Sequence, residues 1–308
     1  MMFPASYQKH FPVMLNEVLR AMSPRDGGVY VDATFGNGGY TEALLEAADC
    51  RVIALDRDPN VRPRAEELKA RYGSRFDFRA GCFGSFADLV SENLDGAVFD
   101  IGVSSMQLDQ SERGFSFSKD APLDMRMSCS GPTAADLVNT LSEKELADVI
   151  YKYGEERKSR QIAAKIVQAR QIEPVATTGR LAEIIYAVIR RTPGAIDPAT
   201  RTFQALRIAV NNELSELENG LKAAAARLKP KGRLAVVTFH SLEDRIVKSF
   251  FKENSGPNVH VSKYAKERPE PGDNVIFAET SKAICPSEEE IGVNKRSRSA
   301  KLRFGIKR

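Results

Sequence analysis

The sequence predicts an α/β fold in which a mostly parallel, doubly wound sheet is interrupted by an inserted α-helical domain. Strand-like and helix-like runs alternate over the first hundred residues, which is the pattern of successive βα units. This alternation stops at about residue 105 and resumes near 200. A chain of 308 residues is long enough to hold two cores. We therefore expect an α/β domain made of 1–110 and 200–308, with a helical domain at 111–199.

The first predicted strand, 29–31, leads into Asp32 and a glycine-rich turn, after which a helix-like run begins. The turn residues are Gly36, Asn37, Gly38, Gly39 and Tyr40. Glycine tolerates positive φ angles and lets a ligand approach the backbone closely. The start of the following helix presents free N–H groups. This stretch is predicted to form a cradle for a ligand.

Three more strands are predicted at 51–56, 75–80 and 95–100, and Asp56 and Asp100 end the first and the last of them. In a doubly wound parallel sheet, ligands bind at the carboxyl ends of the strands, where α/β nucleotide folds place an acid for ribose hydroxyls. One aspartate after a strand is commonly a helix cap. Three of them around a glycine turn favour a ligand that carries hydroxyls and a positive charge.

The glycine turn lacks the motifs of two common nucleotide sites, which argues against several classes of ligand. No G-x-G-x-x-G follows the first strand directly, and Asp32 would repel a pyrophosphate, so a dinucleotide is disfavoured. A P-loop is excluded because no Gly-Lys-Ser/Thr follows. An acid at this place suits an ammonium group and a sulfonium. The strand-Asp-x-x-x-Gly-x-Gly pattern resembles the first motif of class I S-adenosylmethionine methyltransferases.

The remaining elements are predicted from periodicity. Three amphipathic helices with basic polar faces occupy the insertion, the first starting at a capping-box spacing between Ser142 and Glu145. One long helix is predicted at about 200–228. A buried strand is then predicted at 233–239, with His240 and Ser241 at its carboxyl end, and Ser241 has cap spacing to Asp244. A loop at 254–274 and two closing strands, 275–284 and 299–306, complete the expected order.

Composition excludes several classes of protein. No apolar run approaches the roughly 18 residues of a membrane span, and the N-terminus lacks an apolar signal core, so a cytoplasmic protein is expected. The four cysteines show neither disulfide nor zinc spacing, and no metal is predicted. A net charge of +4 is too small to establish a polyanionic partner. A basic run such as 295–308 is more often a solvated face or tail than an RNA contact.

Motifs spanning nearly the whole chain identify a family. They are 32–39, 56–59, 100–109, 113–117, 122–127, 153–157, 198–205, 239–248 and 298–303. In this order they resemble the small-subunit ribosomal RNA methyltransferase H family, also called the MraW family. The resemblance implies a class I S-adenosylmethionine-dependent methyltransferase fold with an inserted substrate-recognition domain. It also implies N4-methylation of a cytidine in the decoding region of 16S rRNA, with S-adenosyl-L-methionine as donor.

The resemblance also implies roles for residues of the cofactor site. Gly38, Gly39 and Tyr40 would contact the methionine moiety, with Asp32, Gly36 and Asn37 completing the turn. The ribose and adenine would be held by Asp56 and Phe83, and Asp100 and Gln107 would close the site. Many members carry histidine where this chain has Tyr40, so contact through the backbone is expected to persist while an imidazole role is not. Ser128 also departs from the common aspartate and is given no role.

For catalysis, we expect Asp100 and Ser104 to accept hydrogen bonds from the reacting amine and the donor. Candidate contacts to a splayed-out nucleotide are Arg113, Phe115, Arg126, Arg201 and His240. Each has a structural alternative. The first three lie in segments that could be ordered crossing loops, Arg201 could form an interdomain salt bridge, and a helix cap is favoured for His240.

Three functions remain open on the residues alone. An rRNA methyltransferase acting on the small ribosomal subunit is the leading interpretation. A methyltransferase for small molecules or proteins is compatible with the cradle, but the basic insertion counts against it. A non-enzymatic RNA-binding assembly factor would not require the three strand-end acids. The sequence leaves the oligomeric state open, with a homodimer as one option.

Overall fold

The computed structural model describes residues 12–256 and 275–308. These form two compact units. Unit 1 contains the chain up to Gly102 and from Leu214 onward, and unit 2 is the continuous stretch Val103–Glu213. Most of the predicted loop at 254–274 lies outside the described residues.

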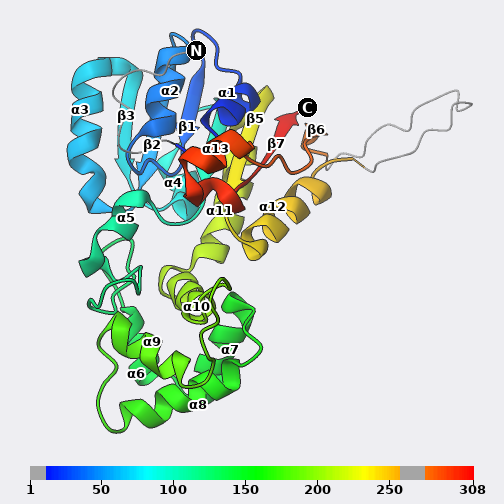
Figure 1. Ribbon diagram of the computed structural model, residues 1–308. Coiled ribbons are helices and arrows are strands. Elements are labelled where there is room, and N and C mark those ends of the chain that lie inside the picture. Colours follow the sequence, from blue (N-terminus) through cyan, green and yellow to red (C-terminus); the bar gives the residue numbers. More distant parts are fainter. Residues whose placement is uncertain (1–11, 257–274) are drawn as a thin grey trace, which may run out of the picture. The chain divides into compact units, whose positions relative to one another are not determined.

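Unit 1 is built on a mixed sheet that has seven strands within the described part of the chain (Figure 1). The strands are β1 (Val29–Asp32), β2 (Arg51–Asp56), β3 (Phe76–Ala80), β4 (Leu94–Asp100), β5 (Leu228–Thr238), β6 (Phe277–Thr280) and β7 (Lys301–Lys307). Their order is β3-β2-β1-β4-β5-β7-β6. The first five are parallel, and β7 pairs antiparallel with both β5 and β6. The predicted doubly wound, mostly parallel α/β sheet is confirmed.

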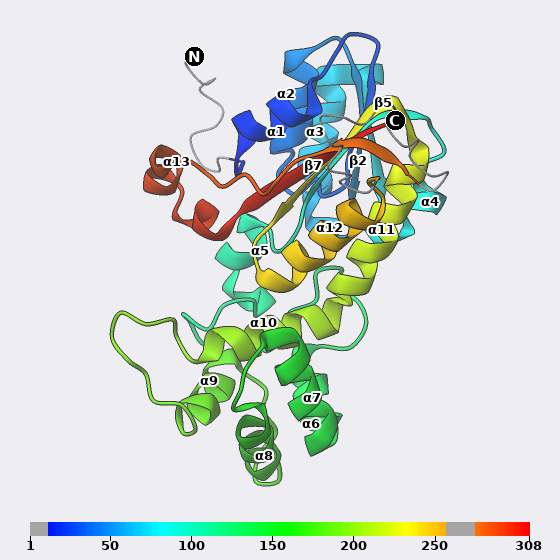
Figure 2. The same cartoon turned by 90° about the vertical axis from the view of Figure 1, so that its right-hand side faces the viewer.

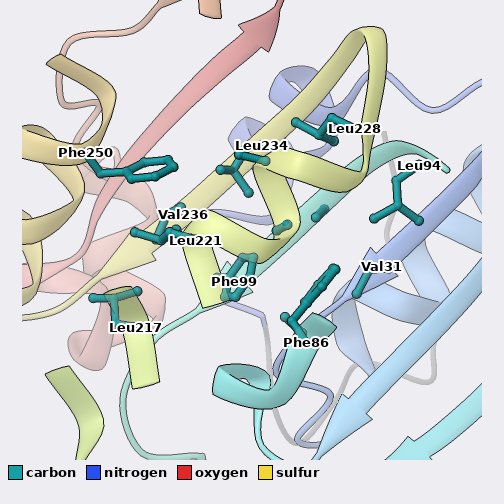
Figure 3. Close-up of a cluster of buried hydrophobic side chains, with 14 of the residues drawn as sticks. Val31, Phe86, Leu94, Phe99, Leu217, Leu221, Leu228, Leu234, Val236 and Phe250 are labelled. Atoms are coloured by element: carbon teal, nitrogen blue, oxygen red, sulfur yellow. The ribbon is translucent and has the colours of Figure 1, made fainter. Parts of the chain in front are cut away.

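Helices cover both faces of this sheet (Figure 2). One face packs against α1 (Leu15–Met22), α2 (Gly39–Ala47) and α3 (Arg62–Tyr72). The other packs against α4 (Phe86–Leu89), α11 (Glu213–Arg227) and α12 (Ser241–Glu253). Alternate strand residues face opposite ways, so Phe99 joins Leu221 and Val236 in the core under α11 (Figure 3). A short helix, α13 (Glu288–Val293), precedes β7.

Unit 2 is helical and has its own core. Its helices are α5 (Ser105–Asp109), α6 (Ala134–Thr140), α7 (Glu143–Gly154), α8 (Ser159–Arg170), α9 (Thr178–Tyr186) and α10 (Ala199–Asn211). Apolar residues spaced by helical turns, such as Ile150, Ile162 and Leu206, are fully buried in one cluster. The predicted capping box of α7 is present, with Ser142 and Glu145 each accepting the other's backbone N–H.

The prediction of one long helix at 200–228 was wrong. The chain breaks at Asn212, whose φ of 51° is left-handed, so α10 and α11 are separate helices. Asparagine tolerates this conformation better than most residues, and the apolar stripe continues across the break, which hid it. Phe203 and Leu206 of α10 pack within the core of unit 2, so α10 belongs to that unit. The boundaries between the two compact units therefore lie between residues 102 and 103 and between residues 213 and 214. The expected boundaries were 199/200 and 110/111.

No cluster that could hold a metal ion is found among the described residues. In the same part of the chain, no helix is both long and apolar enough to cross a membrane. All four cysteines are free thiols.

Candidate functional site

Asp32 ends β1 and ties the glycine turn together. The carboxylate is 1% exposed. Its Oδ1 accepts the N–H of Thr34 at 3.2 Å, and its Oδ2 accepts the N–H and the hydroxyl of Thr41 at 3.1 and 2.8 Å. Burial raises the pKa of Asp32 to about 6, against the lowering effect of these hydrogen bonds. Asp32 therefore replaces a side-chain cap at the start of α2 and holds the turn in shape.

The N-terminus of α2 retains two backbone donors. Its N-cap residue, Gly38, has a φ of 76° and supplies no side-chain cap. The Asp32 carboxylate accepts the backbone N–H of Thr41, and the N–H of Glu42 donates to the Gly38 carbonyl. Within the described chain, the N–H groups of Gly39 and Tyr40 donate to no protein acceptor. Such a helix start attracts a carboxylate or another anion.

The close approach at Gly39 is made by the chain itself. A Cβ at this position would lie 2.3 Å from Cγ of Pro12. The neighbouring Tyr40 is buried, and its hydroxyl donates to the carbonyl of Val13. Burial raises the pKa of Tyr40 well above its usual value, so the phenol stays neutral. The Tyr40 side chain therefore anchors the segment before α1, and only its backbone N–H remains for a ligand.

Asp56 ends β2 and also holds the turn. Its Oδ2 accepts the N–H of Gly36 at 2.8 Å, and its Oδ1 accepts the N–H of Asp58 at 2.8 Å. Burial raises the pKa of Asp56. The residue is only partly buried, and each carboxylate oxygen has a second lone pair. Asp56 can therefore still accept hydrogen bonds from hydroxyl groups.

Asp100 ends β4 and differs from the other two acids. Its backbone N–H donates to the Thr34 hydroxyl at 2.7 Å. Its Oδ1 is sealed from solvent and has no hydrogen-bond partner among the described residues. Burial raises the pKa of Asp100 well above its ordinary value, and the nearby carboxylates of Asp32 and Glu243 raise it further. A buried acceptor without a donor is costly, so this oxygen marks a place for a ligand's donor group.

Phe83 lies at the carboxyl end of β3, in a short turn of 3₁₀ helix. Its ring meets Phe99 edge to face, with centroids 5.8 Å apart. The residue is partly exposed, so one part of the ring packs on the core and another remains accessible. An accessible aromatic ring at this edge of the sheet can contact a planar base.

His240 follows β5 by two residues and caps α12. Its Nδ1 accepts the N–H of Glu243 at 3.5 Å, and Glu243 Oε2 accepts the His240 N–H at 3.2 Å. The Nε2 atom lies 2.8 Å from Glu243 Oε1, in a contact not aligned as a hydrogen bond. Both ring nitrogens therefore face Glu243, which agrees with a cap. The capping pair is His240 and Glu243, one residue earlier than the predicted pair of Ser241 and Asp244.

The remaining site candidates belong to unit 2, where two of them form a capping box. The Ser104 hydroxyl accepts the N–H of Gln107 at 3.2 Å, and Gln107 Oε1 accepts the Ser104 N–H at 3.0 Å. This pair begins α5. The Ser104 hydroxyl can still donate its own proton.

In unit 2, arginines of the loop segments 113–117 and 122–127 hold the backbone in place. Arg113 is 9% exposed and donates to the carbonyls of Arg126 and Met127 at 2.9 and 3.0 Å. The Arg113 guanidinium lies 5.7 Å from the ring centroid of Phe115, which is also buried. Arg126 forms a two-pronged ion pair with Asp124, at 2.9 and 2.7 Å. These contacts fit the ordered-loop alternative.

Arg201 pairs within its own unit. Its Nη1 lies 3.8 Å from Oε2 of Glu156, and both residues belong to unit 2. The expected structural alternative, a salt bridge of Arg201, is therefore present, but it lies within unit 2 and not between two units. The Arg201 side chain is 52% exposed, so the guanidinium remains accessible to a further anion.

Part of the C-terminal basic run is used inside unit 1. Arg303 and Lys301 pair with Asp244 at 2.7 and 3.3 Å. Lys307 Nζ donates to the carbonyls of Ala225 and Leu228 at 3.1 and 2.7 Å, at the end of α11. Lysine at a helix C-terminus stabilises the last carbonyl groups. These three cations therefore have structural roles in the sheet and the helix beside it.

Sequence reasoning missed Thr34, Thr41 and Glu243. Thr34 and Thr41 connect Asp32, Asp100 and α2, and the signal for them was a threonine at the positions two and nine residues after Asp32. Glu243 is fully buried. Its signal was a glutamate three residues after His240, which is the spacing of a capping box. Histidine is not a usual N-cap residue, which hid it.

A sheet of this order, with acids at the ends of β1, β2 and β4 beside an uncapped helix start, defines a class I S-adenosylmethionine-dependent methyltransferase fold. The comparisons assign the chain within that class. The model of the MraW methylase family matches residues 7–308. The chain therefore belongs to the MraW methylase family, and it is a methyltransferase.

The chain is similar to proteins that carry the name ribosomal RNA small subunit methyltransferase H, among them those of two Rickettsia species. The relative from Rickettsia bellii is 57% identical over 305 residues, covering 97% of this chain and 99% of the relative. The relative from Rickettsia massiliae is 57% identical over 298 residues, covering 96% and 97%. An rRNA-methylase structure from Clostridium thermocellum is 12% identical, with a TM-score of 0.44 over 97% and 99% of the chains. That superposition is too loose to carry an argument.

Proposed function

We propose that this protein methylates the exocyclic N4 amine of a cytidine in the decoding region of 16S rRNA, with S-adenosyl-L-methionine as the methyl donor. The names of its close relatives support a small-subunit rRNA substrate. The observation that carries the chemistry is the buried Oδ1 of Asp100, which has no hydrogen-bond partner among the described residues. Both the donor and the substrate amine offer the hydrogen-bond donors that such an oxygen needs.

The residues of unit 1 fit the donor by chemical type. A methionine moiety is a zwitterion, with a carboxylate and an ammonium group. The free N–H groups of Gly39 and Tyr40 suit the carboxylate, and the Asp100 carboxylate suits a cation. Asp56 suits the ribose hydroxyls, and the accessible part of Phe83 suits the adenine. Asp32, Gly36, Asn37 and Gly38 keep this edge in shape.

The protein's part in the reaction is to position an amine and to accept its hydrogen bonds. S-adenosyl-L-methionine supplies a methyl group activated by a positively charged sulfur. The cytosine amine is a weak nucleophile because its lone pair is delocalised into the ring. Asp100 accepts a hydrogen bond from this amine and orients it, and its raised pKa suits it to accept a proton. The Ser104 hydroxyl oxygen accepts a further hydrogen bond through its second lone pair, and Gln107 holds Ser104 in place.

The RNA would be held as a single strand with the target base splayed out, because a stacked base does not expose its amine to in-line attack. Arg201 is the accessible cation among the predicted substrate residues. Arg113, Phe115 and Arg126 act by shaping the crossing segments, and His240 acts by starting α12. We place the protein in the cytoplasm, with its ribosomal substrate. The homodimer is still a prediction, and light scattering measures the oligomeric state that tests it.

The test uses purified protein, methyl-labelled donor and either 30S subunits or deproteinised 16S rRNA. The labelled RNA is digested to nucleosides, which separates N4-methylcytidine from C5- and 2′-O-methylcytidine. We expect N4-methylcytidine, mapped to one position of the decoding region, and no label in RNA whose target cytidine is replaced by uridine. Label in another nucleoside, or none with either substrate, overturns the proposal.

A further inference from the structure

A cavity of about 380 Å³ lies where α7 turns into α8 in unit 2, and no site residue discussed so far lines it. Its lining residues are Tyr151, Arg157, Lys158, Ser159, Arg160 and Gln161. The turn belongs to the motif at 153–157, whose presence the methyl-transfer site does not explain. Both helices are labelled in Figure 1.

The lining of the cavity holds three cations and no carboxylate, although the exposed Glu155 belongs to the same turn. Glu156 is 7% exposed, and its Oε1 accepts the N–H of Lys158 at 2.8 Å while its Oε2 faces Arg201. Asp148 lies 3.7 Å from Arg160, and both side chains are more than half exposed. For Arg157 and Lys158, no carboxylate partner occurs in the described part of the chain. The wall is therefore cationic, which suits an anion.

Hydrogen-bond donors are unused at the same wall. Ser159 is only 4% exposed, yet its hydroxyl has no hydrogen-bond partner among residues 12–256 and 275–308. The first turn of α8 has no side-chain cap. In the same described ranges, the N–H groups of Arg160 and Gln161 meet no protein acceptor. A hydroxyl and two backbone donors beside two cations are the groups that bind a phosphate.

An aromatic ring stands at the cavity. Tyr151 is 63% exposed, which is unusual for so large an apolar surface. Exposed aromatic rings beside cations are typical of single-stranded nucleic-acid sites, where bases stack on the ring and phosphates meet the cations. An acidic peptide would use the cations but would leave the ring without a stacking partner.

We propose that this cavity binds one nucleotide of the single-stranded RNA substrate, with its phosphate at the start of α8 and its base on Tyr151. The phosphate contacts Arg157, Lys158 and the Ser159 hydroxyl. The inference rests on the proposed function only in taking RNA as the substrate. It concerns how the RNA is held and adds nothing to the methyl-transfer step.

The first test compares two double variants of the full-length protein. Arg157→Gln with Lys158→Gln removes two charges from the cavity, and Lys144→Gln with Lys165→Gln removes two exposed charges from the same helices outside it. Binding of a labelled single-stranded RNA decamer is followed by fluorescence anisotropy over a series of salt concentrations. We expect the cavity variant to bind roughly tenfold more weakly, with the salt slope reduced by about one. Equal losses in both variants overturn the proposal.

The second test addresses stacking. Tyr151→Ala is expected to weaken binding of the decamer roughly tenfold without changing the salt slope, and Tyr151→Phe is expected to bind like the wild type. Polyglutamate is the competing polyanion. If it displaces RNA as well as unlabelled RNA does, or if Tyr151→Ala binds normally, the nucleotide assignment fails.

A third measurement separates this inference from the proposed function. In the methylation assay, the cavity variants should raise KM for RNA and leave kcat and donor binding unchanged. A wild type that methylates RNA while the cavity variants keep its KM disproves the cavity inference alone. A wild type that binds RNA through the cavity but labels none disproves the proposed methylation alone. Thermal melts confirm that each variant is folded.

Discussion

The ends of β1 and β4 carry the same residue and lie side by side in the sheet, yet the two carboxylates do different things. Both oxygens of Asp32 accept hydrogen bonds from Thr34 and Thr41. Asp100 has an oxygen that is sealed from solvent and unpaired within the described residues. An acid at a strand end is thus either a part of the scaffold or an acceptor for a ligand. What distinguishes them is whether the local chain supplies donors.

The largest expected effect is on catalysis through Asp100. Asp100→Asn keeps the shape but removes the group that accepts the proton, so we expect methyl transfer in single-turnover experiments to fall roughly 100- to 1,000-fold. The fold should be preserved, because no protein hydrogen bond to the carboxylate is lost among the described residues. A folded variant that binds donor and reacts at the wild-type rate removes Asp100 from the mechanism.

Asp32→Ala should instead reduce stability. It leaves the buried N–H of Thr41 and the N–H of Thr34 without their acceptor, and the start of α2 loses its cap. We expect a loss of about 2 kcal/mol in the free energy of unfolding at pH 7, measured with urea. Asp100→Asn serves as the control, since it alters the neighbouring strand end. If the two variants have the same free energy of unfolding, the assignment of Asp32 to the scaffold and of Asp100 to ligand binding is wrong.

The cost of Asp32→Ala should depend on pH. The pKa of Asp32 is raised to about 6, from 3.8, so the folded state binds more protons than the unfolded state between these values. The contribution of Asp32 to stability therefore grows as the pH falls from 7 to 4.5. We expect the difference between wild type and Asp32→Ala to increase by about 1–2 kcal/mol over this range. Other titrating groups largely cancel in that difference. A difference that shrinks contradicts a raised pKa.

The smallest effect is expected at the N-cap of α12. Asparagine is a good N-cap residue, so His240→Asn should change stability by about 0.5 kcal/mol or less, whereas His240→Ala should cost about 1 kcal/mol. Methyl transfer by His240→Asn should stay within roughly threefold of the wild type, because the ring acts as a cap. A 100-fold loss of activity in a stable His240→Asn protein would make His240 a catalytic base.

Much of the fold followed from the sequence because its signals are local. The central parallel strands contain short apolar runs, and the acids that end β1, β2 and β4 lie where the pattern placed them. The break at Asn212 was not predictable from periodicity, since one left-handed residue leaves the apolar stripe intact. The free oxygen of Asp100 was not predictable either. It depends on which donors the neighbouring threonines supply, and those are set by how the turn folds.

The order in which the chain is made matters for the pairing of β4 with β5. These adjacent strands end and begin at Asp100 and Leu228, with the whole of unit 2 between them in sequence. A growing chain therefore completes β4 long before its partner exists, while unit 2 is continuous and has its own core. Contacts between distant segments form slowly, and domains fold as units during synthesis. Unit 2 is consequently expected to be folded before the central sheet can close, leaving the β4 edge unpaired until late in translation.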